Sequence, residues 1–187
     1  KTDDLLRNIL PNEVADELKE KGEALARQYD EVTVLFTDFV DFTKISEHLS
    51  PRQLVSELHD CFKAFDDIIE RHGLEKIKTI GDAYMAVSGL PLPDARHACN
   101  AARAALDIQR YIRQRQETHP AGFDIRIGLN SGPVVAGIVG VKKFAYDIWG
   151  DMVNTAARME SGSEPGKINI SGATYSLIQG EFDCVYR

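Results

Sequence analysis

The sequence predicts an α+β domain of the ferredoxin-like type, an antiparallel β-sheet with helices packed on one face. Its 187 residues have the length of one domain. Apolar residues occur in β-type runs and at helical spacing in the order β-α-β-β-α-β, with additions at both ends. Hydrophobic residues make up 43% and charged residues 27% of the chain, a balance typical of a globular domain that buries a core.

The first half of the pattern predicts a buried strand, a long helix and a hairpin. The strand is a β-branched, apolar run. Ser50 and Pro51 provide an N-cap and a first helical position, and Gly81-Asp82 provides the hairpin turn. We expect these elements at residues 32–36 (strand), 51 to about 73 (helix), 75–80 and 83–87 (hairpin strands).

The second half predicts a further long helix with many small residues, followed by shorter elements. A Ser131-Gly132 turn separates two of its strands. We expect these elements at residues 95–114 (helix), 123–129 and 133–139 (strands), 151–160 (helix), 167–170 (strand), 172–178 (helix) and 182–186 (strand).

Residues 1–22 form a separate helical segment ahead of the domain, which spans residues 23–187. Pro11 marks a helix start and Gly22 a helix end. An apolar stripe this short is unstable alone, so it packs on the domain or continues a helix from an upstream regulatory module. The stripe consists of Leu5, Leu6, Ile9, Val14 and Leu18.

Composition excludes several classes of protein. The net charge of −7 argues against binding to nucleic acid. No run approaches ~18 apolar residues, so we expect no membrane contact by this segment. Cys61, Cys99 and Cys184 are odd in number and form no CxxC pair, which favours a reducing, cytoplasmic location.

Two aspartates stand at the ends of predicted strands. Asp38 follows the first buried strand and Asp82 lies in the hairpin turn. Alone, each is typical of a cap or a turn. In a ferredoxin-like sheet the two elements are neighbours, and two close carboxylates repel unless a cation lies between them. Together they predict a two-metal phosphate site, for which Mg²⁺ is the usual ion.

Polar residues later in the chain are candidates for substrate binding. Arg126 stands in an otherwise apolar strand and needs an anionic partner or an exposed face. Asn154 and Arg158 are four residues apart and share a helix face, where they hold a sugar and a phosphate or lie on a solvated flank. Lys78 and Asp147 are either ordinary exposed strand residues or a pair of side chains that binds substrate.

Four segments resemble the catalytic domain of the class III nucleotidyl cyclases, from about residue 31 to the end. The resemblance implies a palm-like, ferredoxin-type fold. Residues 8–11 also resemble the segment that joins such domains to upstream regulatory or membrane modules. The four segments are Leu35–Thr43 (LFTDFVDFT), Lys76–Met85 (KIKTIGDAYM), Arg126–Gly132 (RIGLNSG) and Tyr146–Met159 (YDIWGDMVNTAARM).

The resemblance implies roles at the phosphate end of the substrate. Asp38 and Asp82 match the two metal aspartates, and the carbonyl of Phe39 matches a further ligand. Two Mg²⁺ ions are implied, and Mn²⁺ suits the same oxygen ligands. Arg126 matches an arginine that contacts the triphosphate.

The resemblance also implies roles at the nucleoside end. Lys78 and Asp147 match the pair that recognises the purine, while Asn154 and Arg158 match the pair that holds the ribose and stabilises the transition state. In the family these residues face the metal residues of a second subunit, so we expect a homodimer with shared sites. Lysine donates and aspartate accepts hydrogen bonds, which matches adenine, so we expect ATP to be converted to cyclic AMP and pyrophosphate.

Some points stay open at this stage. The general base is water or Asp38. Asp41 stands where many members of the family have glycine, and we expect it to face solvent. A phosphate-contacting lysine of the family lies in a hairpin beyond Arg187, so we expect an incomplete phosphate site here. The alternatives are a guanylyl cyclase, a catalytically silent regulator of the same fold, or a diguanylate cyclase, whose Gly-Gly-Asp-Glu-Phe signature the sequence lacks.

Overall fold

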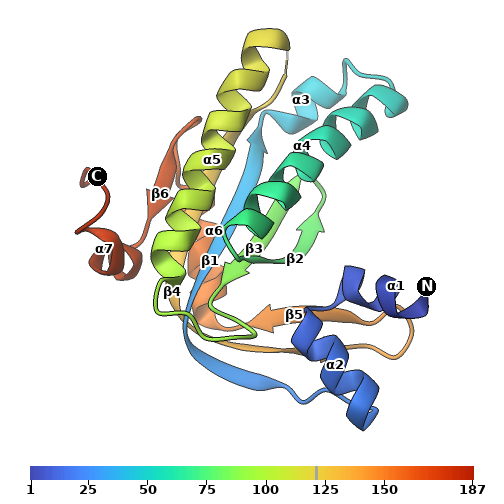
Figure 1. Ribbon diagram of the computed structural model, residues 1–187. Helices are drawn as coiled ribbons and strands as arrows, with labels where there is room; N and C mark the ends of the chain where they lie inside the picture. Colours follow the sequence, from blue (N-terminus) through green and yellow to red (C-terminus); the bar gives the residue numbers. More distant parts are fainter. Residues whose placement is uncertain (121) are drawn as a thin grey trace.

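The computed structural model describes residues 1–120 and 122–187 and is built around a six-stranded sheet (Figure 1). The strand order is β2-β3-β1-β4-β5, and β6 pairs with β4 in parallel while the other pairs are antiparallel. The part β2-β3-β1-β4 has the ferredoxin-like order, which confirms the predicted fold class. The strands are β1 (Arg27–Val40), β2 (Glu75–Ile80), β3 (Ala83–Ser88), β4 (Asp124–Val139), β5 (Ala145–Trp149) and β6 (Ile168–Ile170).

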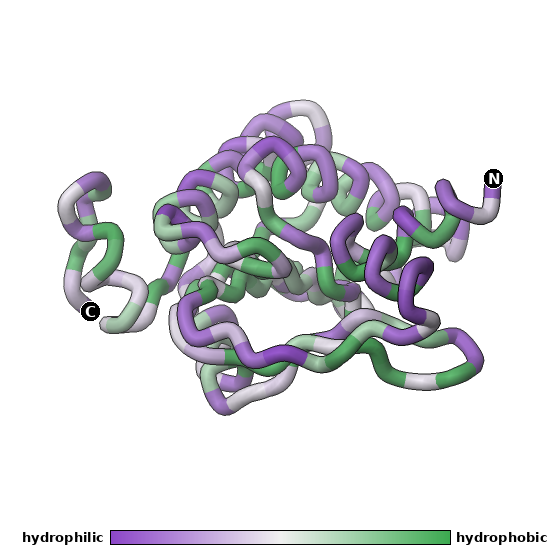
Figure 2. Tube along the Cα trace, turned by 60° about the horizontal axis from the view of Figure 1, so that its bottom comes forward, coloured by the Kyte–Doolittle hydropathy of each residue, from purple (hydrophilic) through white to green (hydrophobic). Residues whose placement is uncertain are grey.

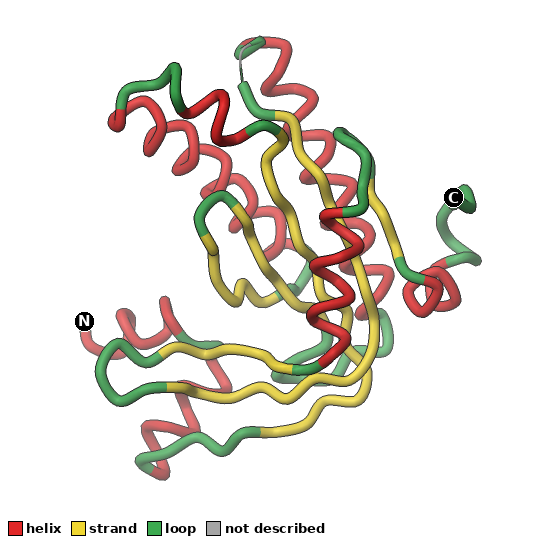
Figure 3. Tube along the Cα trace, turned by 180° about the vertical axis from the view of Figure 1, so that it is seen from behind, coloured by secondary structure: helices red, strands yellow, loops and turns green. Residues whose placement is uncertain are grey.

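Helices cover both faces of the sheet, and the prediction of helices on one face was wrong. Helices α4 and α5 lie on one face (Figure 1), and α6 crosses the opposite face, as the view from behind shows (Figure 3). The helices are α1 (Thr2–Ile9), α2 (Asn12–Lys21), α3 (Phe42–Ser46), α4 (Pro51–Arg71), α5 (His97–Thr118), α6 (Asp151–Ser161) and α7 (Gly172–Ile178).

The reason for two helical layers is visible in the central strand β1, which is apolar on both sides. Leu35 and Phe39 belong to the core beneath α4 and α5, whereas Val34 and Phe36 belong to the core beneath α6. A strand buried on both faces requires cover on both faces. Hydrophobic segments accordingly lie in the sheet between the helical layers (Figure 2).

The predicted strands 123–129 and 133–139 form the single strand β4 instead. Ser131 and Gly132, which we expected to form a turn, pair with Thr33 and Val32 of β1. Because this ladder continues through both residues, the chain stays extended across them. The strand β1 is correspondingly longer than the predicted run 32–36.

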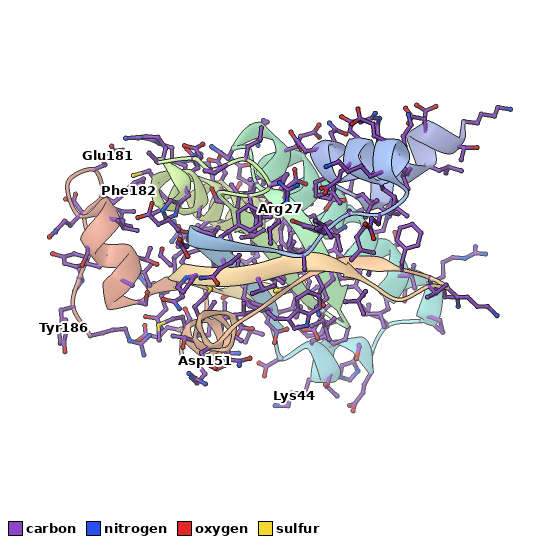
Figure 4. All side chains as sticks on the ribbon, turned by 90° about the horizontal axis from the view of Figure 1, so that it is seen from below. Arg27, Lys44, Asp151, Glu181, Phe182 and Tyr186 are labelled. Atoms are coloured by element: carbon purple, nitrogen blue, oxygen red, sulfur yellow. The ribbon has the colours of Figure 1, made fainter. Side chains whose placement is uncertain are left out.

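The predicted strand at residues 182–186 does not form. The chain leaves α7 and is held by Glu181, whose carboxylate accepts bonds from Arg96 (2.6 and 2.8 Å) and Arg103 (3.0 Å) of the α5 region. Phe182 lies beneath the Arg103 guanidinium. Figure 4 shows Glu181, Phe182 and Tyr186 at the end of the molecule opposite α1 and α2, away from the central strands.

The N-terminal segment packs on the sheet through part of its stripe. Val14 and Ala15 of α2 are buried in the core beneath α6. Leu5 and Ile9 are 66% and 56% exposed, so the first helix leaves its apolar side largely open. Gly22 ends α2 in the left-handed conformation, as expected. Within the described residues, no helix combines the length and the apolar character needed to cross a bilayer.

Candidate active site

The two predicted metal aspartates meet at one edge of the sheet. Strand β3 pairs with β1 up to Thr37 and Tyr84, so the β2–β3 turn lies beside the end of β1. The backbone N–H of Phe39 donates to Oδ2 of Asp82 at 3.3 Å, which joins the turn to the strand. The ring of Phe39 is buried against Phe123 and anchors this backbone from the other side.

The carboxylates at this edge are suited to a divalent cation. Burial, followed by the hydrogen bond and the charge of Asp38, raises the pKa of Asp82 to about 6. Oδ1 of Asp38 is buried and has no hydrogen-bond partner among the described residues. A cation between the two carboxylates would remove both penalties. Mg²⁺ commonly uses one or two carboxylates together with substrate phosphates, so the donor set fits.

Outside this pair, the described part of the chain offers no cluster of three or more His, Cys, Asp or Glu side chains able to hold a metal ion. Asp41, the neighbouring acidic residue, is exposed and precedes α3 in the left-handed conformation, with φ 56°. Aspartate tolerates this conformation better than most residues. The expectation that Asp41 faces solvent is therefore confirmed.

Arg126 lies beside the two aspartates, Asp38 and Asp82. It is the register partner of Asp38 across β1 and β4. Its Nε donates to the carbonyl of Ser163 at 3.1 Å, so the side chain runs toward the end of α6. We expected an anionic partner or an exposed face for Arg126. Its side chain is half-buried, and the acidic residues near it are its register partner Asp38 and Glu160 of α6, while its printed hydrogen bond goes to a backbone carbonyl.

Glu160 is a site residue that the sequence reasoning missed. It is only 7% exposed, at the end of α6. Its pKa is raised by burial, while a contact with Asp38 and the charge of Arg126 act in the opposite direction. The sequence contained an indication that Glu160 is buried. Glu160 follows Met152 and Ala156 at intervals of four residues and therefore continues the buried side of the helix.

Lys78 and Asp147 come together although 69 residues separate them. Nζ of Lys78 lies 2.8 Å from Oδ2 of Asp147. The first is on β2 and the second on β5, at opposite edges of the main sheet. The pair joins across the face that carries α6, and its side chains are 42% and 20% exposed. An accessible donor and an accessible acceptor thus stand side by side.

Asn154 and Arg158 lie on the outer side of α6. Both are exposed, whereas Met152, Ala156 and Glu160 face the sheet. A guanidinium N–H of Arg158 donates to the hydroxyl of Thr155 at 3.0 Å, which holds it along the helix. The two residues therefore share a face, as predicted, but this face points away from the sheet that carries Asp38 and Asp82.

Comparison with known proteins places this arrangement in a family. The family model described as the adenylate and guanylate cyclase catalytic domain matches residues 24–187. An adenylate cyclase of Mycobacterium tuberculosis (strain ATCC 25618 / H37Rv) is 43% identical over 179 residues, which cover 95% of this chain. The chain spans 40% of the length of that relative.

Solved structures agree with the match. The catalytic core of a rhodopsin-guanylyl cyclase with converted specificity, in complex with ATPαS, has a TM-score of 0.81 and 44% identity, over 84% of this chain and 86% of that one. A guanylyl cyclase domain from the fungus Blastocladiella emersonii, solved in a dimeric and in a monomeric form, has TM-scores of 0.79 and 0.78 and identities of 41% and 42%. Each form matches 84% of this chain, and the matched regions cover 88% and 90% of those chains. The chain belongs to the family of adenylate and guanylate cyclase catalytic domains.

Proposed function

We propose that this domain converts ATP to 3′,5′-cyclic AMP and pyrophosphate. The observation that carries the choice of base is the Lys78–Asp147 pair, whose polar atoms lie 2.8 Å apart. On the edge of adenine, N1 accepts a hydrogen bond and the neighbouring 6-amino group donates one. Lysine only donates and ionised aspartate only accepts, so the pair complements adenine. Guanine reverses the pattern, with O6 accepting and N1–H donating, and would leave both side chains mismatched.

The two metal ions held at Asp38 and Asp82 would act at the triphosphate. Two Mg²⁺ or Mn²⁺ ions held by Asp38, Asp82 and the carbonyl of Phe39 would make the ribose 3′-OH more acidic and offset the negative charge of the phosphates. Arg126, beside Asp38, supplies a further positive charge for the triphosphate. The 3′-OH gives its proton to water or to Asp38, its oxygen attacks the α-phosphorus, and the bond from the α-phosphorus to the leaving pyrophosphate breaks as the ring closes.

The outer side of α6 would supply the remaining groups. The amide of Asn154 orients the ribose, and the guanidinium of Arg158 stabilises the charge that develops in the transition state. Loss of one such donor typically lowers the rate by about 10²–10³. Because these side chains point away from the sheet with Asp38 and Asp82, a complete site needs the metal pair of one chain and the α6 face of a second chain.

Exposed apolar surface supports a homodimer. Valines of β4 and its connection to β5 are exposed, with Val139 at 52% and Val141 at 96%, and Trp149 of β5 is 42% exposed. Figure 1 shows this hairpin extending from the body of the sheet, and Figure 2 shows its hydrophobic character. Apolar residues gathered on one projecting element are typical of a protein–protein contact.

A substitution of the base-recognition pair tests the substrate. Lys78→Glu combined with Asp147→Cys replaces the donor by an acceptor and removes the original acceptor. We expect the double variant to lose most cyclic AMP formation and to gain activity with GTP, measured with both nucleotides in Mg²⁺ and in Mn²⁺. Lys76→Glu is the matched control, because Lys76 is also on β2 but pairs with Asp66 of α4.

An unchanged preference for ATP in the double variant would contradict the assignment of the pair. Cyclic GMP as the main product of the unaltered chain would contradict the choice of adenine and identify a guanylyl cyclase. No product from either nucleotide at high protein concentration would favour a regulatory domain of the same fold.

A further inference from the structure

Two lysines of β2 stand two residues apart but bind different elements. Nζ of Lys76 lies 3.0 Å from Oδ1 of Asp66, on α4. Nζ of Lys78 lies 2.8 Å from Oδ2 of Asp147, on β5. In a regular strand, residues two positions apart point to the same face of the sheet. The pairing of β2 with β3 shows why these two lysines do not.

A β-bulge separates the two lysines. Lys76 pairs with Ala86 of β3, whereas Lys78 pairs with Met85, the adjacent residue of β3. The register therefore shifts by one residue, and Ile77 is the extra residue of β2. A bulge of this kind changes the direction of the side chains that follow it.

The cores on the two faces of the sheet show the new direction. Ala86 belongs to the core beneath α4 and α5, and Met85 to the core beneath α6. Residues directly opposite each other on paired strands share a face. Lys76 therefore faces the α4 side and Lys78 the α6 side. Ile77 also packs against the core beneath α6, so Ile77 and Lys78 lie on the same side of β2.

Strand β5 lies over the same side of the sheet. Tyr146 and Ile148, which flank Asp147, both belong to the core beneath α6. If β2 paired regularly from residue 76 onward, Lys78 would lie opposite Tyr84, which belongs to the core beneath α4 and α5. Lys78 would then point away from Asp147. The shift of one residue is what brings the two side chains within hydrogen-bond distance.

We propose that the bulge at Ile77 is a specificity-determining element of the nucleotide site, because it turns Lys78 to the side on which β5 carries Asp147. The inference rests on the proposed role of this pair in recognising the base. Ile77 touches no nucleotide in this scheme and is a positioning residue. The choice of base then depends on the number of residues between Lys76 and the hairpin turn, as well as on which residues these are.

Deletion of Thr79 tests the proposal by removing the extra residue on the turn side of Lys78. Regular pairing from the unchanged turn then puts Lys78 opposite Tyr84. We expect the ratio of kcat/KM for ATP to that for GTP to fall by about 10–100-fold, the range for losing one hydrogen bond from a charged group. Adding Ile77→Lys to the deletion puts a lysine opposite Met85 again and should restore most of the ratio. Thr79→Ala removes the same side chain without changing the residue count, and this matched control should keep the ratio.

Two exchanges of neighbouring residues test the same point at constant length. Thr79 pairs with Tyr84 and therefore lies on the α4 side, whereas Ile77 lies on the side of Lys78. In a regular strand Ile77 and Thr79 would share a face. Ile77→Lys with Lys78→Ile should therefore keep an ATP-to-GTP ratio about tenfold or more above that of Lys78→Thr with Thr79→Lys. Equal ratios in the two exchanges would overturn the proposal.

Nuclear magnetic resonance measures the register independently of activity. We expect contacts between backbone protons of Lys78 and Met85 in the unaltered chain, and of Lys78 and Tyr84 after deletion of Thr79. Thermal unfolding verifies that each variant is folded.

Three results would count against the proposal, and one of them identifies a different failure. Pairing of Lys78 with Tyr84 in the unaltered chain would overturn it, as would an unchanged ratio in a deletion variant that has this pairing. If the register is as described but Lys78→Ala leaves the ratio unchanged, the proposed recognition of the base by this pair fails, and the role of the bulge in specificity fails with it.

Discussion

At the scale of single residues, one glycine determines how closely α6, which carries Asn154 and Arg158, lies on the sheet. Gly128 allows the backbone of α6 at Met159 and Glu160 to approach β4 without an intervening side chain. The same approach brings Glu160 beside Asp38 and turns Asn154 and Arg158 outward. Packing at one position therefore sets the direction of all three side chains.

Gly128→Ala should destabilise the domain and impair the site. The added methyl group would meet backbone atoms of α6 at 2.1 and 2.6 Å, which a rotamer change cannot relieve. Overpacking of this kind costs about 1–3 kcal/mol or more in the free energy of unfolding. Urea unfolding measures this loss.

Gly172→Ala is the control for the glycine substitution. A methyl group added at Gly172 would meet no atom of a neighbouring element within 4 Å, and the residue lies in a helix, where alanine is favoured over glycine. Equal urea midpoints for Gly128→Ala and the unaltered chain would show that α6 can move away from the sheet at little cost.

At the scale of elements, the helix α2 and the strand β2 place two carboxylates close together. Burial, followed by the charge of Glu13, raises the pKa of Glu75 to about 7. The ordinary value is 4.5, so between these values the folded chain binds a proton that the unfolded chain has lost. Stability from this group is present below pH 4.5 and decreases as the pH rises toward 7.

Glu75→Gln should remove this pH dependence. Between about pH 4.5 and about pH 7.5 the free energy of unfolding of the unaltered chain should fall relative to the variant by about 1–3 kcal/mol. Urea unfolding at a series of pH values measures the difference. Glu47→Gln, at an exposed position, should follow the unaltered chain. Parallel curves for Glu75→Gln and the unaltered chain would show that the carboxyl is not penalised in the fold.

At the scale of the whole molecule, the two groups of site residues point in different directions. Asp38 and Asp82 lie at the edge formed by β1 and the β2–β3 turn, whereas Asn154 and Arg158 lie on the outer side of α6. In the proposed mechanism a single chain therefore carries two half-sites. A two-fold dimer would join them into two complete sites.

Mixing two inactive variants tests this arrangement. Asp38→Asn damages the metal half-site and Arg158→Ala the transition-state half-site, so each alone should be nearly inactive. After random exchange at equal concentrations, half of the dimers are mixed, and each mixed dimer has one intact site. Activity should return to about a quarter of that of the unaltered chain.

The control for mixing pairs Asp38→Asn with Asp82→Asn. Both substitutions affect the same half-site, so no mixed dimer has an intact site and activity should not return. Formation of mixed dimers is verified by measuring the size and the mass of the dimers after mixing. Failure of the first pair to recover activity, despite verified exchange, would contradict the shared site.

Much of the fold follows from local patterns in the sequence. Ser50 and Gln53 form a capping box at the start of α4 and Pro51 is its first residue, because the necessary side chains are close together in the chain. The hairpin of β2 and β3 and the strand order of the ferredoxin-like core were also predicted. The predicted strand at 182–186 was wrong, because Glu181 bonds to two arginines of the α5 region, and the sequence pattern cannot register such a long-range contact.

The sequence by itself determined most of the helices and strands, since spacing and turn residues act over a few positions. The family resemblance supplied the roles of Lys78, Asp147, Asn154 and Arg158. Only the tertiary structure decided which groups meet. Lys78 and Asp147 come together although 69 residues separate them, and Glu160 lies beside Asp38 because α6 packs on Gly128. Such contacts depend on how helices and strands pack in space, which no local pattern specifies.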